Sequence, residues 1–325
     1  MNKFKELPKS FIFNRGHGYG QTMNIKKYSH IIGAALVFIG AICFSVKAIM
    51  IKVAYTYNVD PLSLLTLRMT FSLPFFIIIP FFYNRYTPKQ QFAKSDYLKI
   101  ILLGLLGYYT ASIFDFIGLK YISASLERLI LFIYPTLVVI LSAVFYKKTI
   151  NARGYIALAL TYVGIYIVFL DDVTLDQKNI ALGSLFIFGS ALTYAVYLVG
   201  SGNLIPKFGS IRFTSYAMIV SSIAVIIQYL IAPTGSVFGL PNEVYWLGFA
   251  IAIISTVIPV FLVSEGINLI GAGKASIIAS VGPITTIVLD HFVLHQPITS
   301  HQIQGTLLVL AGVLLVGAKK DLSRI

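Results

Sequence analysis

Two stretches, GLKYISASLERLILFIYP at residues 118–135 and GINLIGAGKASIIASVGP at residues 266–283, lie 148 positions apart and share a pattern of glycine, alanine and proline. The same pattern relates residues well outside these stretches. Tyr97 matches Tyr245 and Gly164 matches Gly312 at a spacing of 148, and Gly33 matches Gly183 and Ala41 matches Ala191 at 150. A recurrence that spans most of the chain indicates a tandem duplication, with one copy over 31–170 and the other over 180–317.

The chain is too apolar for a water-soluble protein. Of its 325 residues, 57% are hydrophobic and 11% are charged, whereas about a quarter of the residues of a soluble domain are charged. Its stretches with about the 20 apolar residues that a helix needs to cross a bilayer are 31–55, 62–83, 97–119, 122–146, 153–170, 180–200, 212–232, 244–265, 274–294 and 301–317. We therefore predict an all-α membrane protein with ten transmembrane helices, five in each copy.

An odd number of helices in each copy fixes how the copies are related. After five crossings the second copy enters the membrane from the opposite side, so the two copies form an inverted-topology repeat. Such repeats build secondary transporters, in which two related halves rock about a site near the bilayer midplane. The sequence thus predicts a carrier that works by alternating access.

The basic residues predict how the chain is oriented. The 25 lysines and arginines outnumber the 12 acidic residues. If the N-terminus is inside, 19 of the 25 fall on the inner side, and only Lys120 and Lys178 fall on the outer side. We therefore expect both termini in the cytoplasm, with a disordered basic tail over 1–30 and a second tail over 318–325. Basic residues that orient a membrane protein do not indicate nucleic acid.

Several of these segments resemble a known family. The run Phe44-Ser45-Val46-Lys47-Ala48-Ile49-Met50-Ile51-Lys52 and the later Leu67-Arg68 resemble the first two helices of EamA-type members of the drug/metabolite transporter superfamily. The two stretches quoted above resemble that family's junctions between helices three and four and between helices eight and nine. The resemblance covers about 31–317. It implies a ten-helix carrier in a bacterial inner membrane for amino acids, nucleotide-related compounds or organic anions.

The chain departs from the family pattern at three places. The family usually has a Gly-Glu pair at the ends of helices four and nine, where this chain has Tyr146-Lys147 and Leu294-His295. The family also usually has a small or amide residue at the position that Lys47 occupies in this chain. The first departure argues against a role for acidic residues at those two places, and the lysine points to a feature particular to this carrier.

Charged residues within apolar helices are the first candidates for a site, because an unpaired charge in a bilayer is costly. The predicted helices place a group of them in the outer part of the first copy: Lys47, Lys52, Arg68, Asp115, Glu127 and Arg128, with Lys120 just beyond. This surplus of positive charge predicts a vestibule that binds a carboxylate or phosphate. Alternatively, Asp115 and Glu127 pair with Arg68 and Arg128 to hold the helices together, and Lys52 reaches the surface.

Two prolines and a tyrosine extend the predicted substrate site. Pro135 and Pro283 occupy equivalent places, and each frees backbone carbonyls that can face a cavity. Tyr134 could contact substrate beside the first of them. A simple packing kink at each proline is the alternative reading.

Glu265, Asp290 and His291 are candidates for proton coupling, since an intramembrane acid or imidazole can take up a proton on one side and release it on the other. Asp290 and His291 lie near the outer end of their helix, where hydration alone could also satisfy them.

No cofactor or metal is predicted. The single cysteine, Cys43, excludes a disulfide within the chain, and His291 and His295 lack a further ligand for zinc. The aspartates of 171–176 occur as one copy in a loop, and the run at 271–274 lacks the first glycine and the Ser/Thr of a phosphate loop. A membrane-embedded enzyme or a flippase that acts on a lipid or prenyl substrate is the alternative to a carrier of a small metabolite.

Overall fold

The computed structural model describes residues 22–85, 93–146, 152–174, 179–202, 204–270, 275, 278–279 and 281–317. These residues form helices joined by short turns, and none of them forms a strand. The helices of the N-terminal half are α1 (Thr22–Tyr55), α2 (Pro61–Arg85), α3 (Lys94–Gly104), the π-helical turn η2 (Leu105–Thr110), α4 (Ala111–Gly118), α5 (Ala124–Leu131), α6 (Tyr134–Tyr146) and α7 (Ala152–Thr174). Those of the C-terminal half are α8 (Ile180–Ser201), α9 (Ile205–Phe208), α10 (Ser210–Ile231), α11 (Asn242–Ala252), the π-helical turn η3 (Ile253–Val257), α12 (Ile258–Ile270), α14 (Val281–Leu294) and α15 (Ser300–Gly317).

The lengths of these helices confirm an all-helical membrane protein. Among the described residues, seven helical segments are long and apolar enough to cross a bilayer: His30–Tyr55, Pro61–Phe82, Lys94–Gly118, Ala124–Phe145, Ile180–Ser201, Ser210–Ile231 and Asn242–Ile270. Three predicted crossings correspond to shorter apolar helices, Gly154–Leu170, Val281–Leu294 and Ser300–Leu315. α1 begins at Thr22, within the segment 1–30 that we expected to be a disordered tail. Residues 1–21 and 318–325 lie outside the described residues.

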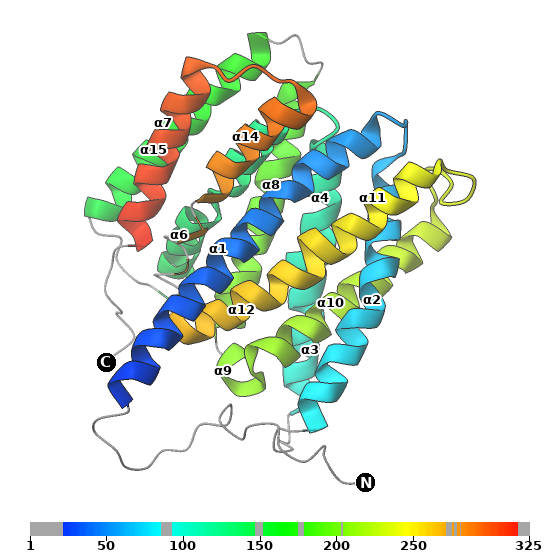
Figure 1. The fold of residues 1–325 in the computed structure, drawn as a ribbon, viewed down its shortest axis with the longest axis vertical. Helices are drawn as coiled ribbons and strands as arrows, with labels where there is room; N and C mark the ends of the chain where they lie inside the picture. The colour runs from blue at the N-terminus through cyan, green and yellow to red at the C-terminus, as the bar shows by residue number, and fades with distance from the viewer. Residues whose placement is uncertain are drawn as a thin grey trace.

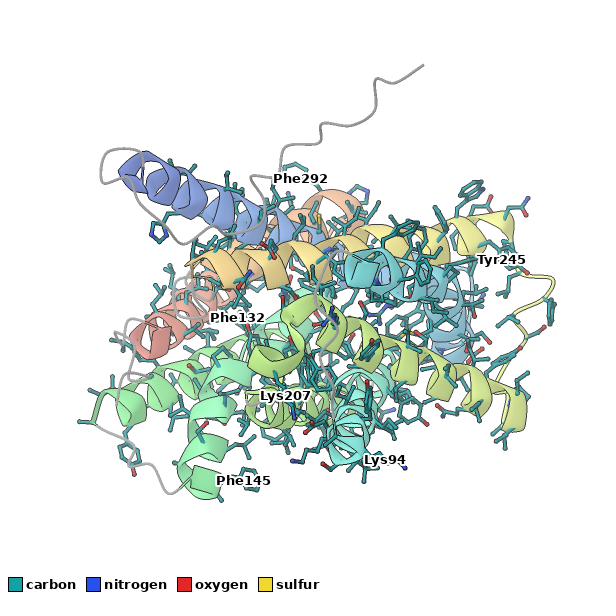
Figure 2. All side chains as sticks on the ribbon, turned by 90° about the horizontal axis from the view of Figure 1, so that it is seen from below. Lys94, Phe132, Phe145, Lys207, Tyr245 and Phe292 are labelled. Atoms are coloured by element: carbon teal, nitrogen blue, oxygen red, sulfur yellow. The ribbon has the colours of Figure 1, made fainter. Side chains whose placement is uncertain are left out.

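The outer surface of the bundle is apolar. Phe145 and Phe292 point outward and are 63% and 71% exposed, whereas Phe132 lies in the interior and is 4% exposed (Figure 2). Water would make so much exposed apolar surface costly, and lipid removes that cost. The surface therefore fits a protein that spans a membrane.

The helices pack in pairs that join the two halves of the chain (Figure 1). α7 lies along α15, α2 along α10, α1 along α12 and α14, and α4 along α8. Gly104 of α3 lies close to backbone atoms of α10. A Cβ atom on Gly104 would lie 2.8 Å from the carbonyl oxygen and 3.1 Å from the Cα of Ala217. This crossing therefore requires glycine.

Two helices contain a widened, π-helical turn at matching places. The turns η2 and η3 begin at Leu105 and Ile253, which are 148 residues apart. In each turn a threonine hydroxyl donates a 3.0 Å hydrogen bond to a carbonyl five residues earlier, Thr110 to Leu105 and Thr256 to Ile251. The sequence did not predict either turn. Such turns are rare and occur often at functional sites.

The turn between α1 and α2 is tied to the connection between α10 and α11. Asp60 accepts hydrogen bonds from the backbone N–H groups of Leu62 (3.0 Å) and Ser63 (3.1 Å) at the start of α2, and from the Thr234 hydroxyl (2.5 Å). Partial burial raises the pKa of the Asp60 carboxyl, but these hydrogen bonds outweigh it and hold that pKa below its usual value. The contact joins the two halves at the end of the molecule where α1 ends.

We expect Thr234→Val to lower the free energy of unfolding by about 1 kcal/mol at neutral pH, because the variant loses a hydrogen bond to a charged group. The pKa of Asp60 is lower in the folded protein, so its stabilisation is complete above the unfolded value of about 3.9 and disappears as the pH falls through the folded value. The variant and the parent should therefore converge when unfolding is measured in acid. Thr234→Ser keeps the hydroxyl and is the matched control; an equal loss in both variants would contradict this role.

Candidate functional site

A cavity of about 210 Å³ lies where helices of the two halves meet, and it is lined by four of the charged residues singled out in the sequence. Its charged lining residues are Lys47, Arg68, Asp115 and Arg128, from α1, α2, α4 and α5. The remaining lining residues are Ala41, Phe44, Gly107, Tyr108, Ala111, Ser112, Leu131, Phe132, Tyr134, Ser190, Ala191, Tyr194, Val263 and Ala279. All of the charge in the lining thus comes from the N-terminal half, and the C-terminal half supplies small, apolar and hydroxyl side chains.

Lys47 joins two carboxylates at the edge of this cavity. Its Nζ lies 2.5 Å from Asp115 Oδ2 and 3.3 Å from Glu127 Oε1. The Asp115 and Glu127 side chains are 4% and 0% exposed, so this is a buried ionic cluster that links α1, α4 and α5. The structure therefore pairs both acids with Lys47, whereas the alternative drawn from the sequence paired them with the two arginines.

Arg68 is buried and is held by neutral groups. Its Nε donates to the hydroxyl of Thr256 in η3 at 2.8 Å, and its Nη1 donates to the hydroxyl of Ser112 at 3.3 Å. Its guanidinium also lies over the ring of Phe116, 5.5 Å from the centroid. None of the described carboxylates lies within ion-pair distance of Arg68. Its positive charge is therefore available to a ligand.

Arg128 is positioned by a serine and a glycine from neighbouring helices. Its Nη2 lies 3.4 Å from Ser45 Oγ, whose hydroxyl lies 3.0 Å from the carbonyl oxygen of Gly282. Its Nε is buried and donates to no acceptor among the described residues. A guanidinium with an unused donor on the wall of a cavity is suited to binding an oxyanion.

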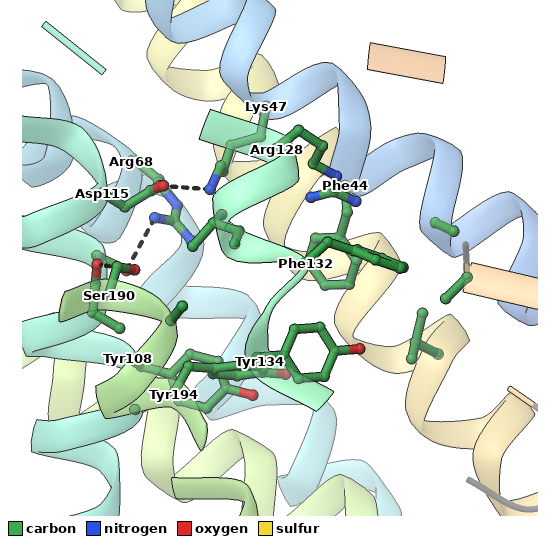
Figure 3. A pocket seen from close by; sticks show the side chains of 18 residues that line it. Phe44, Lys47, Arg68, Tyr108, Asp115, Arg128, Phe132, Tyr134, Ser190 and Tyr194 are labelled. Atoms are coloured by element: carbon green, nitrogen blue, oxygen red, sulfur yellow. Dashed lines mark hydrogen bonds and ion pairs between the residues drawn. The ribbon is translucent and has the colours of Figure 1, made fainter. Parts of the chain in front are cut away.

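The opposite side of the cavity is aromatic. Figure 3 shows Lys47, Arg68 and Arg128 on one side and Tyr108, Tyr134 and Tyr194 on the other. The Tyr134 and Tyr194 rings meet edge to face with their centroids 5.4 Å apart, and Tyr108 and Tyr194 are 6.3 Å apart. The cavity thus offers cationic groups to one end of a ligand and aromatic faces to the other.

We expect Gly282→Ala to weaken substrate binding and leave the fold intact. The new Cβ would lie 2.7 Å from Arg128 Nη2 and 3.2 Å from its Nε, so the guanidinium, which is the flexible end of its side chain, must move. A rise in the KM for uptake of about tenfold, with the maximal rate retained, corresponds to about 1.4 kcal/mol of lost binding. Gly202→Ala is the control, since a Cβ there meets only Val199 O, at 3.5 Å. An unchanged KM would contradict the placement of Arg128 at the substrate.

The three candidates for proton coupling lie outside this cavity. Glu265 is half-buried in α12 and does not contribute to the lining. Asp290 is 2% exposed, and its Oδ2 accepts hydrogen bonds from the backbone N–H and the hydroxyl of Ser125. His291 is exposed, and its Nδ1 lies 2.8 Å from the carbonyl oxygen of Gln296.

Pro135 lies at the start of α6, and Pro283 lies near the first described residue of α14. α5 ends at Leu131 and α6 begins at Tyr134, so the fourth predicted crossing is interrupted just before Pro135. α14 begins at Val281, two residues before Pro283, and most of the chain immediately before it lies outside the described residues. Leu131, Phe132 and Tyr134 line the cavity, so the first interruption lies at its wall.

Two lysines of the predicted vestibule line a separate hollow. A space of about 440 Å³ beyond the end of α1 is lined by Lys52, Tyr55, Thr56, Asn58, Val59, Asp60 and Lys120. In the described part of the chain, no group of three His, Cys, Asp or Glu side chains is arranged to hold a metal ion.

Comparison with known proteins identifies the family. The chain matches the EamA-like transporter family twice, over residues 31–170 and 181–318. The uncharacterized transporter YcbK of Bacillus subtilis (strain 168) is 32% identical over 278 residues, which cover 84% of this chain and 88% of the relative. The uncharacterized inner membrane transporter YicL of Salmonella typhimurium is 22% identical over 226 residues, 69% of this chain and 74% of the relative.

A solved structure supports the same fold. A protein crystal structure that is 14% identical in sequence superposes with a TM-score of 0.62, over 87% of this chain and 97% of that one. At this identity the similarity concerns the fold alone. The family match, which covers most of the chain, completes the identification. The chain belongs to the EamA-like transporter family, as the resemblance to the drug/metabolite transporter superfamily predicted, and is a multi-pass membrane protein.

Proposed function

We propose that this protein is a secondary transporter that moves a small anionic or zwitterionic metabolite, such as an amino acid, a nucleotide-related compound or an organic anion, across the cytoplasmic membrane. The cavity between the two halves carries this proposal. Lys47, Arg68 and Arg128 outnumber its single lining carboxylate, Asp115, in a member of a transporter family. Cations in a low-dielectric cavity favour a ligand that brings negative charge. The aromatic side fits the uncharged part of such a ligand.

The proposal includes ten crossings in two inverted halves, 31–170 and 180–317. The helix pairs support it. In the repeat α1 is equivalent to α8 and α12 to α4, and α1 lies along α12 as α8 lies along α4 (Figure 1). The equivalent helices α2 and α10 lie along each other, as do the equivalent helices α7 and α15. The two π-helical turns, 148 residues apart, support it as well. In this arrangement both termini are cytoplasmic, as the basic residues predict.

The position of the cavity supports alternating access as the mechanism. Its wall combines α1, α2, α4 and α5 of the N-terminal half with Ser190, Ala191 and Tyr194 of α8 and with Val263 of α12. A rocking motion of one half against the other would expose the same charged groups first to one side of the membrane and then to the other. No ATP-binding element is needed for this cycle.

Transport by the purified full-length chain in proteoliposomes tests the proposal. The panel is labelled alanine, glutamate, malate, uridine monophosphate and benzenesulfonate, with a fluorescent phospholipid as the probe for a flippase and product analysis of added lipid for an enzyme. Uptake of at least one water-soluble anion or zwitterion, saturable and lost in Arg128→Gln, is the expected result. Movement or conversion of lipid without uptake of any solute would overturn it.

A further inference from the structure

The ionic cluster around Lys47 has one cation for two carboxylates, and this imbalance has a consequence for transport. Glu127 lies 3.3 Å from Lys47 Nζ and is completely buried. Its Oε2 and the Oδ1 of Asp115 are buried oxygens that accept no hydrogen bond from the described residues. The ionised form of Glu127 therefore depends on Lys47 for its stabilisation.

Few other charged groups face Glu127 from the surrounding helices. They are Asp115 from α4, which carries the same sign, and Arg128, the next residue of α5, whose Nη2 is directed to Ser45. Arg68 on α2 faces Asp115. Asp290 on α14 accepts a hydrogen bond from the backbone N–H of Ser125.

Among the side chains that the structure describes in the remaining helices packed against α5, none is a charged group within ion-pair distance of Glu127. α8 has no acidic or basic residue, and its titratable groups are tyrosines. In α7 the charged residues lie in the first and last turns, and His301 at the start of α15 is exposed. Lys47 is thus the one described cation within ion-pair distance of Glu127.

A substrate anion that enters the cavity competes with these carboxylates for Lys47. Asp115 is bound more closely, at 2.5 Å, so Glu127, at 3.3 Å, is the carboxylate that the anion displaces first. A buried carboxylate that loses its only close cation is costly, and its low-energy response is to take up a proton and become neutral. The proton comes from water on the side to which the cavity is open.

We propose that Glu127 is a proton-binding site and that one proton binds there for each substrate anion bound at Lys47, which makes the protein a proton–anion symporter. When the anion leaves on the other side, Lys47 is again available, Glu127 ionises, and the proton is released to water on that side. This inference rests on the proposed transport function. It moves the coupling site from Glu265, Asp290 and His291 to the ionic cluster.

Benzenesulfonate is the probe of choice because its charge does not change with pH, so it cannot carry the proton itself. Proteoliposomes that contain the full chain and a trapped pH indicator, with the membrane voltage clamped, should acidify inside as benzenesulfonate enters, one proton for each anion. A gradient of one pH unit should drive up to about tenfold accumulation, as expected for one coupled proton. In Glu127→Gln, which mimics the protonated acid, exchange of labelled for unlabelled benzenesulfonate should persist, while accumulation falls to onefold and acidification is lost.

Glu265→Gln is the matched control, because it makes the same chemical change at a half-buried acid outside the cavity lining. It should keep the tenfold accumulation. Uptake by the parent protein without any proton movement would overturn symport and leave the transport function standing. Retained proton movement in Glu127→Gln, or its loss in Glu265→Gln, would overturn the assignment to Glu127.

An infrared measurement covers the case in which Glu127→Gln does not fold. Binding of benzenesulfonate to the purified parent protein should produce the C=O stretching band of a newly protonated carboxyl group. The band should persist in Asp115→Asn, where Glu127 is the carboxylate left beside Lys47. Binding of benzenesulfonate with no such band in the parent would overturn the proposal.

Discussion

Replacing Lys47 by methionine is expected to abolish uptake of every transported anion and to lower the free energy of unfolding by about 3–5 kcal/mol. Lysine at this position binds two buried carboxylates, Asp115 and Glu127. Without it both carboxylates lose their close cation, and removing one partner of a buried ion pair costs more than the pair itself contributes. Sequence reasoning alone would expect a stable variant, because it does not show which acids reach Lys47.

The triple variant Lys47→Met, Asp115→Asn, Glu127→Gln separates the two effects. It should recover most of the lost stability, because no carboxylate is left without its cation, but it should not transport. Thermal unfolding of the purified variants measures the first effect, and uptake into proteoliposomes measures the second. Parent-like uptake in the Lys47→Met variant would contradict the role of Lys47 in substrate binding. Parent-like stability would show that the two acids do not depend on it.

The second large effect is expected at the crossing of α3 and α10. Gly104→Ala would place a Cβ 2.8 Å from the carbonyl oxygen and 3.1 Å from the Cα of Ala217. Backbone atoms of a packed helix cannot turn aside as a side chain can, so the two helices must separate. We expect a loss of about 3 kcal/mol, at the upper end of the range for overpacking.

Gly202→Ala serves as the control here as well, since a Cβ there meets only Val199 O, at 3.5 Å. Its midpoint of thermal unfolding should stay near that of the parent, while the midpoint of Gly104→Ala should fall by several degrees. Equal midpoints for the two variants would show that α3 and α10 do not approach each other as closely as the structure places them.

Much of this fold could be predicted from the sequence. Apolar runs of bilayer length have few structural alternatives, which is why the seven long crossings begin and end near the predicted residues. The start of α1 at Thr22 was missed because polar and basic residues also occur in the first turns of a helix. The turns η2 and η3 were missed because a single extra residue leaves no trace in an apolar run.

The site was predictable in part. Lys47, Arg68, Asp115 and Arg128 line one cavity because charges in apolar helices avoid lipid, and Glu127 contacts Lys47 beside it. Their role with substrate stays a prediction. The partners were not predictable, since Thr256, which binds Arg68, and Gly282, which binds Ser45 beside Arg128, lie far along the chain. Nor could Tyr108 and Tyr194 be chosen from among 20 tyrosines and 24 phenylalanines.

The ionic cluster also constrains how the protein is made. Asp115 and Glu127 follow Lys47 by 68 and 80 residues, so at roughly 5–20 residues per second the lysine is synthesised several seconds before either partner exists. During that interval α1 contains an unpaired charge, whose insertion costs about 3 kcal/mol at the centre of a bilayer. The first helix therefore reaches its final environment only after α4 and α5 have left the ribosome.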